Sequence, residues 1–99
     1  MKITEEMSLI ESIRKLTELG TKTLVVSNSQ NILLGTLSDG DIRRAIIKGF
    51  DVDEPIRAIY NKNPNYILKK EFNKEKAFNL FFNNHFDLIP IVDENKVIS

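Results

Sequence analysis

Apolar residues recur at helical spacing near the start of the chain. Between Ser8 and Leu19 they stand three or four positions apart, at Leu9, Ile10, Ile13, Leu16 and Leu19. This spacing predicts an amphipathic helix. Ser8 and Glu11 form the S-x-x-E pattern of a capping box, and Gly20 stands where a helix C-terminal glycine is common. We therefore expect a surface helix that ends at Gly20.

Two strands and a second helix are expected next. Residues 23–26 are rich in β-branched side chains, and the polar run SNSQN at 27–31 favours a turn. The apolar residues that follow predict a second strand over 32–37. A helix from Asp39 to about Lys48 has apolar residues on one face, and Gly49 ends it. The order helix, strand, strand, helix is typical of a mixed α/β domain.

The pattern continues through a connector into a second half. Pro55 suits the first turn of a short helix, which we expect to run through Ile59, and residues 61–64 form a connector. After it we expect a strand at 66–68, a helix over 73–84, the apolar run LIPIV at 88–92 and a turn at 93–95. The second half therefore repeats the order of the first.

Aligning residues 23–27 with 89–93 gives two repeats about 66 residues apart, with a slip of one residue. The two repeats have low sequence identity but the same order of expected elements. In this alignment Ser99 falls one residue before the position that matches Gly35. We therefore expect the second repeat to lack a counterpart of the segment GTLSDGD and of the covering helix. Apolar surface would stay uncovered at Ile89, Ile91 and Ile98, and we expect a homodimer to cover it.

Composition narrows the function classes. A chain of 99 residues, 41% of them hydrophobic, suits a single compact domain. Its formal charge is zero, which disfavours nucleic-acid and anionic-membrane partners. There is no cysteine, so disulfides, thiolate metal sites and a cysteine nucleophile are excluded, as suits a cytoplasmic protein. The polar start does not resemble a secretory signal, and no apolar run approaches the ~20 residues of a membrane span.

The segment Gly35 to Asp41, GTLSDGD, carries the strongest candidate chemistry, because an apolar strand passes through it into a helix. Ser38 and Asp41 form S-x-x-D at the helix start, which a plain capping box would explain. The same geometry suits a ligand, because free N–H groups and the helix dipole attract anions there. Gly35 and Gly40 would let that ligand approach the backbone. Both interpretations remain open on the residues alone.

The aspartates of this segment limit which part of a nucleotide could lie where. A phosphate beside Asp39 and Asp41 would be repelled about as strongly as the helix dipole attracts it. A carboxylate is well suited to accept both hydroxyls of a ribose. The phosphate would then lie nearer Ser38, with Lys22, or Arg43 or Arg44, supplying positive charge.

The segment GTLSDGDIRRAIIKGF, followed by IYNKNP at 59–64, resembles the CBS domain and is similar to the CBS modules attached to bacterial sugar-phosphate isomerases and sugar nucleotidyltransferases. The resemblance implies an α/β CBS-domain pair built from a β-α-β-β-α repeat. Residues 1–62 would form the first motif. Residues 63–99 would form the second motif, incomplete at its C-terminal end.

The resemblance also implies a function. It predicts a regulatory module, not an enzyme, that binds an adenosine nucleotide such as AMP or ATP between the motifs and requires no cofactor. The module would control an attached or partner enzyme of sugar-nucleotide metabolism. By position, Ser38 would contact phosphate and Asp41 would hold the ribose, and Lys22, Thr23 and Arg44 complete the expected ligand-binding set. The alternative is a structural dimerisation module without ligand, in which Ser38 and Asp41 are only helix caps.

Other candidates are weaker. The DxD at Asp39 and Asp41 lacks the further carboxylates of a calcium loop, so we expect no metal site. His85 is the only histidine and has no partner pattern of a catalytic group, so we expect no catalytic residue. The phenylalanines between 78 and 86 have helical spacing, which favours a core over a stacking platform.

Overall fold

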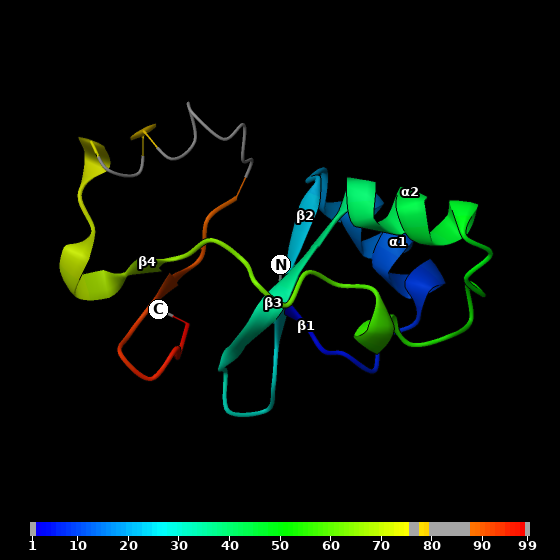
Figure 1. Cartoon of the computed structure of the whole chain (residues 1–99), viewed down its shortest axis with the longest axis horizontal. Helices are drawn as coiled ribbons and strands as arrows, with labels where there is room; N and C mark the ends of the chain where they lie inside the picture. The colour runs from blue at the N-terminus through cyan, green and yellow to red at the C-terminus, as the bar shows by residue number, and fades with distance from the viewer. Residues whose placement is uncertain (1, 76–77, 80–87, 99) are drawn as a thin grey trace.

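The computed structural model of the chain describes residues 2–75, 78–79 and 88–98 (Figure 1). Its strands and helices run in the order β1 (Lys2–Ile3), α1 (Leu9–Leu19), β2 (Thr23–Ser27), β3 (Leu33–Ser38), α2 (Asp39–Ile47), η1 (Ile56–Ala58), β4 (Ile67–Leu68), η2 (Lys69–Glu71) and β5 (Ile91–Val92). The elements η1 and η2 are short 3-10 helices.

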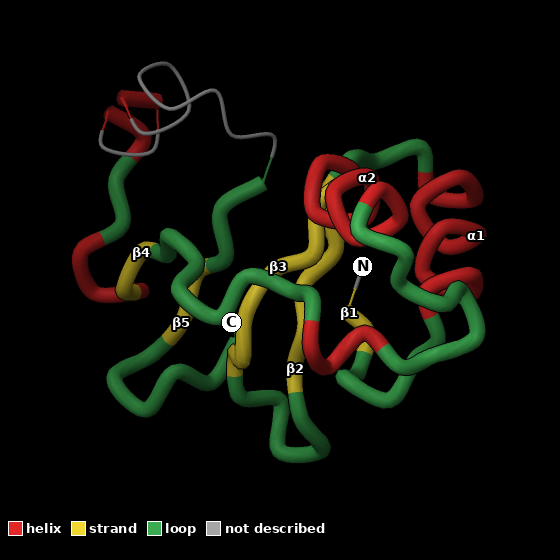
Figure 2. Tube along the Cα trace, turned by 45° about the vertical axis from the view of Figure 1, so that its right-hand side comes forward, coloured by secondary structure: helices red, strands yellow, loops and turns green. Residues whose placement is uncertain are grey.

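The first repeat is a three-stranded sheet covered by two helices. The strands lie in the order β1-β2-β3, with β1 parallel and β3 antiparallel to β2. Both helices lie on the same side of this sheet (Figures 1 and 2). They enclose a core of Ile3, Leu9, Leu16, Leu24, Val26, Leu37, Ile42, Ile56 and Tyr60. The order β-α-β-β-α is therefore the one expected.

The helix ends follow the sequence signals. The Ser8 side chain accepts the Glu11 N–H at 3.2 Å, and Gly20 ends α1 with φ of 65°. Gly49 follows α2 with φ of 87°, a conformation that glycine adopts without strain. Among the described residues no hydrogen bond from the Ser8 N–H to the Glu11 carboxylate is found, so this capping box is half formed.

Two features of the first repeat are not evident from the hydrophobic pattern. The strand β1 is only two residues long and follows no apolar run, yet Ile3 pairs with Val26 and is buried. The short helix η1 is a 3-10 turn, and Pro55 stands at its N-cap instead of inside it. Both elements are fixed by tertiary contacts that the local sequence does not encode.

The second repeat is less regular than its pattern predicted. Strand β4 pairs in parallel with β5, which is limited to Ile91 and Val92 instead of the five-residue run LIPIV. Pro90 lacks an N–H and contributes only its carbonyl, which accepts the Ile67 N–H at 3.0 Å. Most of the helix expected at 73–84, together with His85 and Phe86, lies outside the described residues, although 74–75 and 78–79 are helical.

The turn of each repeat has the same hydrogen-bond pattern. In the first, the Asn28 side chain accepts the N–H groups of Gln30 and Ile32, and Asn31 has φ of 62°. In the second, the Asp93 side chain accepts the N–H groups of Asn95 and Val97, and Lys96 has φ of 65°. Asp93 therefore corresponds to Asn28. The alignment of residues 23–27 with 89–93 pairs Asp93 with Ser27 instead, so it is shifted by one residue.

These two turns also join the repeats. The Leu33 N–H donates to the Lys96 carbonyl at 2.8 Å, and the Ile98 N–H donates to the Asn31 carbonyl at 2.9 Å. Leu33 corresponds to Ile98 in the repeats, and Asn31 corresponds to Lys96, so each bond is the symmetric counterpart of the other. A local twofold axis therefore lies between Ile32 and Val97, which form an isolated bridge. Beside this joint a second core forms from Val25, Leu33 and Val92.

Exposed apolar surface is distributed differently from the expectation. Ile89, Ile91 and Ile98 are only partly exposed, and Ile98 packs against the second core. The most exposed large apolar side chains are Ile47 at 77% and Phe78 at 65%. Among the described residues the second sheet is therefore not the main apolar surface, and the argument for a homodimer from that sheet is weakened.

Candidate functional site

Strand register brings together three of the five predicted ligand residues. Thr23 pairs with Ser38 at the end of the β2–β3 ladder. The carbonyl of the preceding residue, Lys22, accepts the Asp39 N–H at 2.8 Å, which fixes the start of α2. Lys22, Thr23 and Ser38 therefore lie at the same edge of the sheet, where the helix begins.

Ser38 and Asp41 form a complete capping box. The Asp41 N–H donates to Ser38 Oγ at 3.1 Å, and the Ser38 N–H donates to Asp41 Oδ2 at 2.9 Å. Two backbone donors that the helix geometry would leave unpaired are thereby satisfied. The bonds fix the Asp41 carboxylate, whose side chain is only 17% exposed.

The two arginines of α2 have different partners. Arg44 Nη2 donates to Asp41 Oδ1 at 2.7 Å, so Arg44 joins the cap. Arg43 Nη2 donates to Asp39 Oδ2 at 2.6 Å, and both of these side chains are largely exposed. Of the two arginines considered for the phosphate, the structure therefore brings Arg44 to the cap and leaves Arg43 on an exposed face.

The glycines of the segment do not serve the expected purpose. A Cβ at Gly35 would collide with the Asn61 carbonyl oxygen and would lie 2.6 Å from the Tyr60 ring. The space beside Gly35 is therefore filled by the chain's own connector, and the expectation that a ligand approaches there was wrong. A Cβ at Gly40 would lie 3.3 Å from Arg44 Nη1, so the guanidinium lies over this glycine.

The connector is anchored beside β3. Thr36 and Asn61 exchange backbone hydrogen bonds of 3.0 and 2.8 Å. Tyr60 is 8% exposed, and its hydroxyl donates to Glu5 Oε2 at 2.6 Å. Burial, the hydrogen bond and the negative charge of Glu5 together raise the pKa of Tyr60 to about 12. The free edge of β3 is thereby covered.

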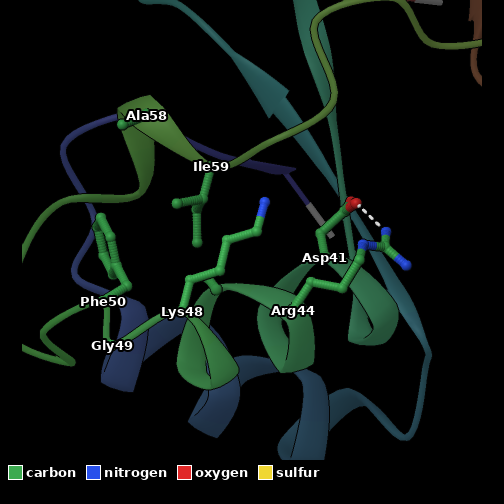
Figure 3. Close-up of a pocket in the computed structure, with 8 residues that line it drawn as sticks. Asp41, Arg44, Lys48, Gly49, Phe50, Ala58 and Ile59 are labelled. Carbon is green, nitrogen blue, oxygen red and sulfur yellow. Dashed lines mark hydrogen bonds and ion pairs between the residues drawn. The ribbon is translucent and has the colours of Figure 1, made fainter.

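A cavity of about 360 Å³ opens between α2 and η1 (Figure 3). Asp41 and Arg44 lie at one end of it, and Lys48 extends along the helix from the other end. The remaining walls are mostly apolar and come from Ala45, Gly49, Phe50, Ala58 and Ile59. The cavity thus combines two cations and one carboxylate with an apolar surface.

The hydrophobic pattern did not reveal this cavity. Lys48 stands four residues after Arg44, and this spacing places both cations on one helix face. That signal was present, but nothing local indicated that Phe50 and Ile59 would close the space. Among residues 2–75, 78–79 and 88–98 there is no group of acidic or histidine side chains suited to a metal. The same residues contain no helix long and apolar enough to cross a membrane.

The capped strand-to-helix junction and the β-α-β-β-α order can be compared with those of known protein families. Residues 1–48 match the family model described as the CBS domain. The whole chain also has the fold of CBS-domain proteins of known structure. Residues 1–48 therefore match the CBS domain and the whole chain shares the fold of such proteins, in agreement with the resemblance seen in the sequence.

Solved structures extend the comparison to the whole chain. A CBS domain protein from Pyrobaculum aerophilum complexed with AMP has a TM-score of 0.83 and 19% identity, covering 100% of this chain and 76% of that one. The cytosolic domain of the Mg2+ channel MgtE in complex with ATP has a TM-score of 0.77 and 22% identity, covering 99% of this chain and 39% of that one. These likenesses show the fold.

Curated relatives are considerably longer than this chain. An uncharacterized protein of Rickettsia prowazekii is 41% identical over 76 residues, which are 77% of this chain and 23% of the relative. An uncharacterized protein of Helicobacter pylori is 33% identical over 92 residues, with 92% of this chain and 27% of the relative covered. The chain thus spans about a quarter of the length of these relatives.

Proposed function

We propose that this chain is a regulatory module that binds an adenosine nucleotide, AMP or ATP, at the start of α2 and controls an attached or partner enzyme. The observation that carries the proposal is the meeting of Lys22, Thr23, Ser38, Asp41 and Arg44 at one junction. Two of the proteins with the same fold are described as complexes with AMP and with ATP. The proposed role is binding, and no residue is assigned to catalysis.

The geometry of the cap suits the proposed assignments. Each carboxylate oxygen can accept more than one hydrogen bond, so Asp41 can keep the Ser38 N–H on Oδ2 while a ribose hydroxyl donates to it. The Ser38 hydroxyl accepts the Asp41 N–H and retains its own hydrogen, which can be donated to a phosphate oxygen. Ser38 would therefore bind phosphate and Asp41 the ribose without loss of the cap.

The regulated enzyme is proposed on a different basis. The relatives are about four times the length of the matched segment, so a module of this kind occurs in longer proteins. The segment GTLSDGDIRRAI supports an enzyme of sugar-nucleotide metabolism as that partner, through its similarity to modules attached to such enzymes. Ligand binding would shift the relative orientation of the two repeats at their joint, and the enzyme would respond to that shift.

One observation favours the alternative of a structural dimerisation module. The capping box of Ser38 and Asp41 is complete without any ligand, and Arg44 already neutralises the Asp41 carboxylate. In that case the cap contributes only stability. The proposed function and the alternative differ in whether the cap residues affect ligand affinity.

Calorimetric titration of the 99-residue chain with AMP, ATP, CMP and 2′-deoxy-AMP tests the proposal. We expect AMP or ATP to bind more tightly than CMP, and AMP more tightly than its 2′-deoxy analogue. In Asp41→Asn the preference over the 2′-deoxy analogue should disappear, with about tenfold weaker AMP binding, because a charged acceptor is lost. If none of the four nucleotides binds, the proposal is wrong.

Ser8 provides a matched control for Ser38, because both are N-caps that accept a backbone N–H three residues on. Ser8→Ala and Ser38→Ala should each lower the free energy of unfolding by about 1 kcal/mol. Only Ser38→Ala should weaken AMP binding. Equal AMP affinities of the two variants would support the structural alternative.

A further inference from the structure

The connector forms one wall of the cavity beside α2. Ala58 and Ile59 line the cavity from the connector, and Ile59 points toward the helix (Figure 3). Asp41, which the proposed function assigns to the ribose, lines the same cavity. Because ribose and phosphate are assigned to Asp41 and Ser38, the base is the part of the nucleotide left to contact this apolar wall. The position of the wall should therefore affect how well a base fits.

Backbone hydrogen bonds hold the connector on either side of this wall. On one side the Ile56 N–H donates to the Met7 carbonyl at 2.9 Å. On the other side Asn61 and Thr36 exchange bonds of 2.8 and 3.0 Å. The wall lies between these two points, so the side chains of residues 57–60 contribute to how closely it is held.

Two side-chain contacts join this stretch to the loop between β1 and α1. Arg57 Nη2 donates to Glu6 Oε2 at 2.8 Å, and these side chains are 58% and 67% exposed. The Tyr60 hydroxyl donates to Glu5 Oε2 at 2.6 Å, and Tyr60 is only 8% exposed. Exposed ion pairs contribute little to stability, whereas a shielded hydrogen bond to a charged acceptor is among the stronger ones. The bond between Tyr60 and Glu5 is therefore the firmer contact.

The Tyr60 ring has little room to move while this bond is intact. A Cβ on Gly35 would lie 2.6 Å from the ring atom Cδ2, so the ring packs directly on the backbone of β3. Lys62 Nζ lies 5.1 Å from the centroid of the same ring. Because Ile59 directly precedes Tyr60 in the chain, a fixed ring also restricts the wall.

We infer that Glu5 is a positioning residue for this cavity, which acts through Tyr60 to hold the apolar wall at the distance that suits the base. Glu5 itself does not line the cavity, so it acts without touching the ligand there. A wall that is already held in place does not have to be ordered when the ligand binds, which favours affinity. The inference rests on the proposed nucleotide site and gives a residue of the loop between β1 and α1 a part in base selection.

Calorimetric titration of the full chain with AMP and with CMP tests the inference in Glu5→Ala and Tyr60→Phe. The two nucleotides share ribose and phosphate, so the ratio of their affinities reports on the base and its wall. Each substitution removes the bond, and AMP should bind about fivefold more weakly. CMP should be weakened less, because its smaller base covers less of the wall, so the ratio should fall about threefold. The double variant should behave like either single variant.

Glu6→Ala is the matched control, because it removes the same charge from the neighbouring residue and leaves the Tyr60 bond in place. Its ratio of AMP to CMP affinity should equal that of the unsubstituted chain. Glu5→Gln should also retain the ratio, because its amide oxygen can still accept the Tyr60 hydroxyl. A ratio that changes as much in Glu6→Ala as in Glu5→Ala would overturn the inference, as would an unchanged ratio in Tyr60→Phe.

The result for the unsubstituted chain separates the two proposals. If it binds neither nucleotide, the nucleotide site is wrong and the inference falls with it. If it binds both equally well, or if Glu5→Ala weakens both by the same factor, the site stands and only the inference is wrong. A bond that merely stabilises the fold would lower the free energy of unfolding and leave the ratio unchanged. Tyr60→Phe keeps the ring on β3, so this variant is expected to fold.

Discussion

The turns of the two repeats are alike, and the described residues that follow them differ. Asn28 and Asp93 each accept two backbone N–H groups, and Asn31 and Lys96 each adopt a positive φ. After the first turn, β3 pairs with β2 through residue 38 and continues into α2. After the second turn the described residues form two isolated bridges, between Val92 and Ile98 and between Ile32 and Val97.

This difference distinguishes features that the local sequence determines from features that need contacts between distant segments. In both repeats an Asx side chain that accepts two backbone N–H groups, with a residue of positive φ three positions later, builds the turn. The candidate site needs more, because Ser38 and Asp41 are placed by a ladder of strand pairs and by a helix. A substitution in the turn and a substitution in the strand should therefore change the free energy of unfolding by different amounts.

Gly35→Ala should have the largest effect, because it acts on β3 at a position where neighbouring atoms leave no room for a Cβ. Its Cβ would collide with the Asn61 carbonyl and the Tyr60 ring, so the connector has to move away from β3. We expect the free energy of unfolding to fall by about 3 kcal/mol, as measured by urea denaturation.

Gly40→Ala controls for the change of residue type. Its nearest atoms belong to the mobile end of Arg44, and alanine favours a helix over glycine by about 0.5–1 kcal/mol. The variant should be as stable as the unsubstituted chain or slightly more so. If Gly35→Ala behaves in the same way, the connector does not hold β3 as described.

An intermediate effect is expected from pH, because the anchor of the connector titrates. The pKa of Tyr60 is about 12 in the folded chain and 10.0 for an ordinary tyrosine. A raised pKa means that the neutral form is favoured by folding, so the stabilisation is complete below pH 10 and is lost as pH rises to 12. The loss should be on the order of 2 kcal/mol.

Tyr60→Phe isolates this titration from that of the other groups. The difference in unfolding free energy between the unsubstituted chain and Tyr60→Phe should be constant below pH 10 and should decrease above it. Every other titratable group is common to both proteins, so its effect cancels in this difference. A difference that does not change from pH 9 to pH 12 would contradict the anchoring role of the Tyr60 hydroxyl.

The smallest effects are expected at the equivalent turn positions, and they should have opposite signs. Lys96→Gly relieves the strain of a positive φ and should raise the free energy of unfolding by about 1 kcal/mol. Loss of the contact between the Lys96 ammonium and the Tyr66 ring reduces this gain. Asn31→Gly removes the bond from Nδ2 to the Ile98 carbonyl and the bond from Lys2. It should destabilise by about 1 kcal/mol. Thermal unfolding of both variants measures this contrast, and equal signs would show that the turns are interchangeable.

The fold was predictable where local signals were sufficient. Leu9, Leu16 and Gly20 gave α1 its face and its end, and Asp39 to Gly49 did the same for α2. The two-residue strand β1 was not visible in the pattern, because Lys2 and Ile3 become a strand only by pairing with Val25 and Val26. The shortening of β5, by contrast, has a local signal, because Pro90 lacks an N–H and the strand begins only after it.

The candidate site was predictable in its residues but not in its surroundings. The spacing of Ser38 and Asp41 predicted the capping box, and the pairing of Thr23 with Ser38 follows from the expected hairpin. The partners of Arg43 and Arg44 have helical spacing, because Asp39 stands four residues before Arg43 and Asp41 three residues before Arg44. The role of Gly35 depends on Asn61, a contact across the chain that no local pattern indicates.

The joint between the repeats combines main-chain hydrogen bonds with the Asn31 side-chain bond and the second core. Two of its bonds run from the N–H groups of Leu33 and Ile98 to the carbonyls of Lys96 and Asn31, and these groups are the same for nearly every amino acid. Side chains on either side can therefore change without shifting the register, and only proline at 33 or 98 would remove a donor. Two halves held in this way can diverge widely in sequence and still fit together.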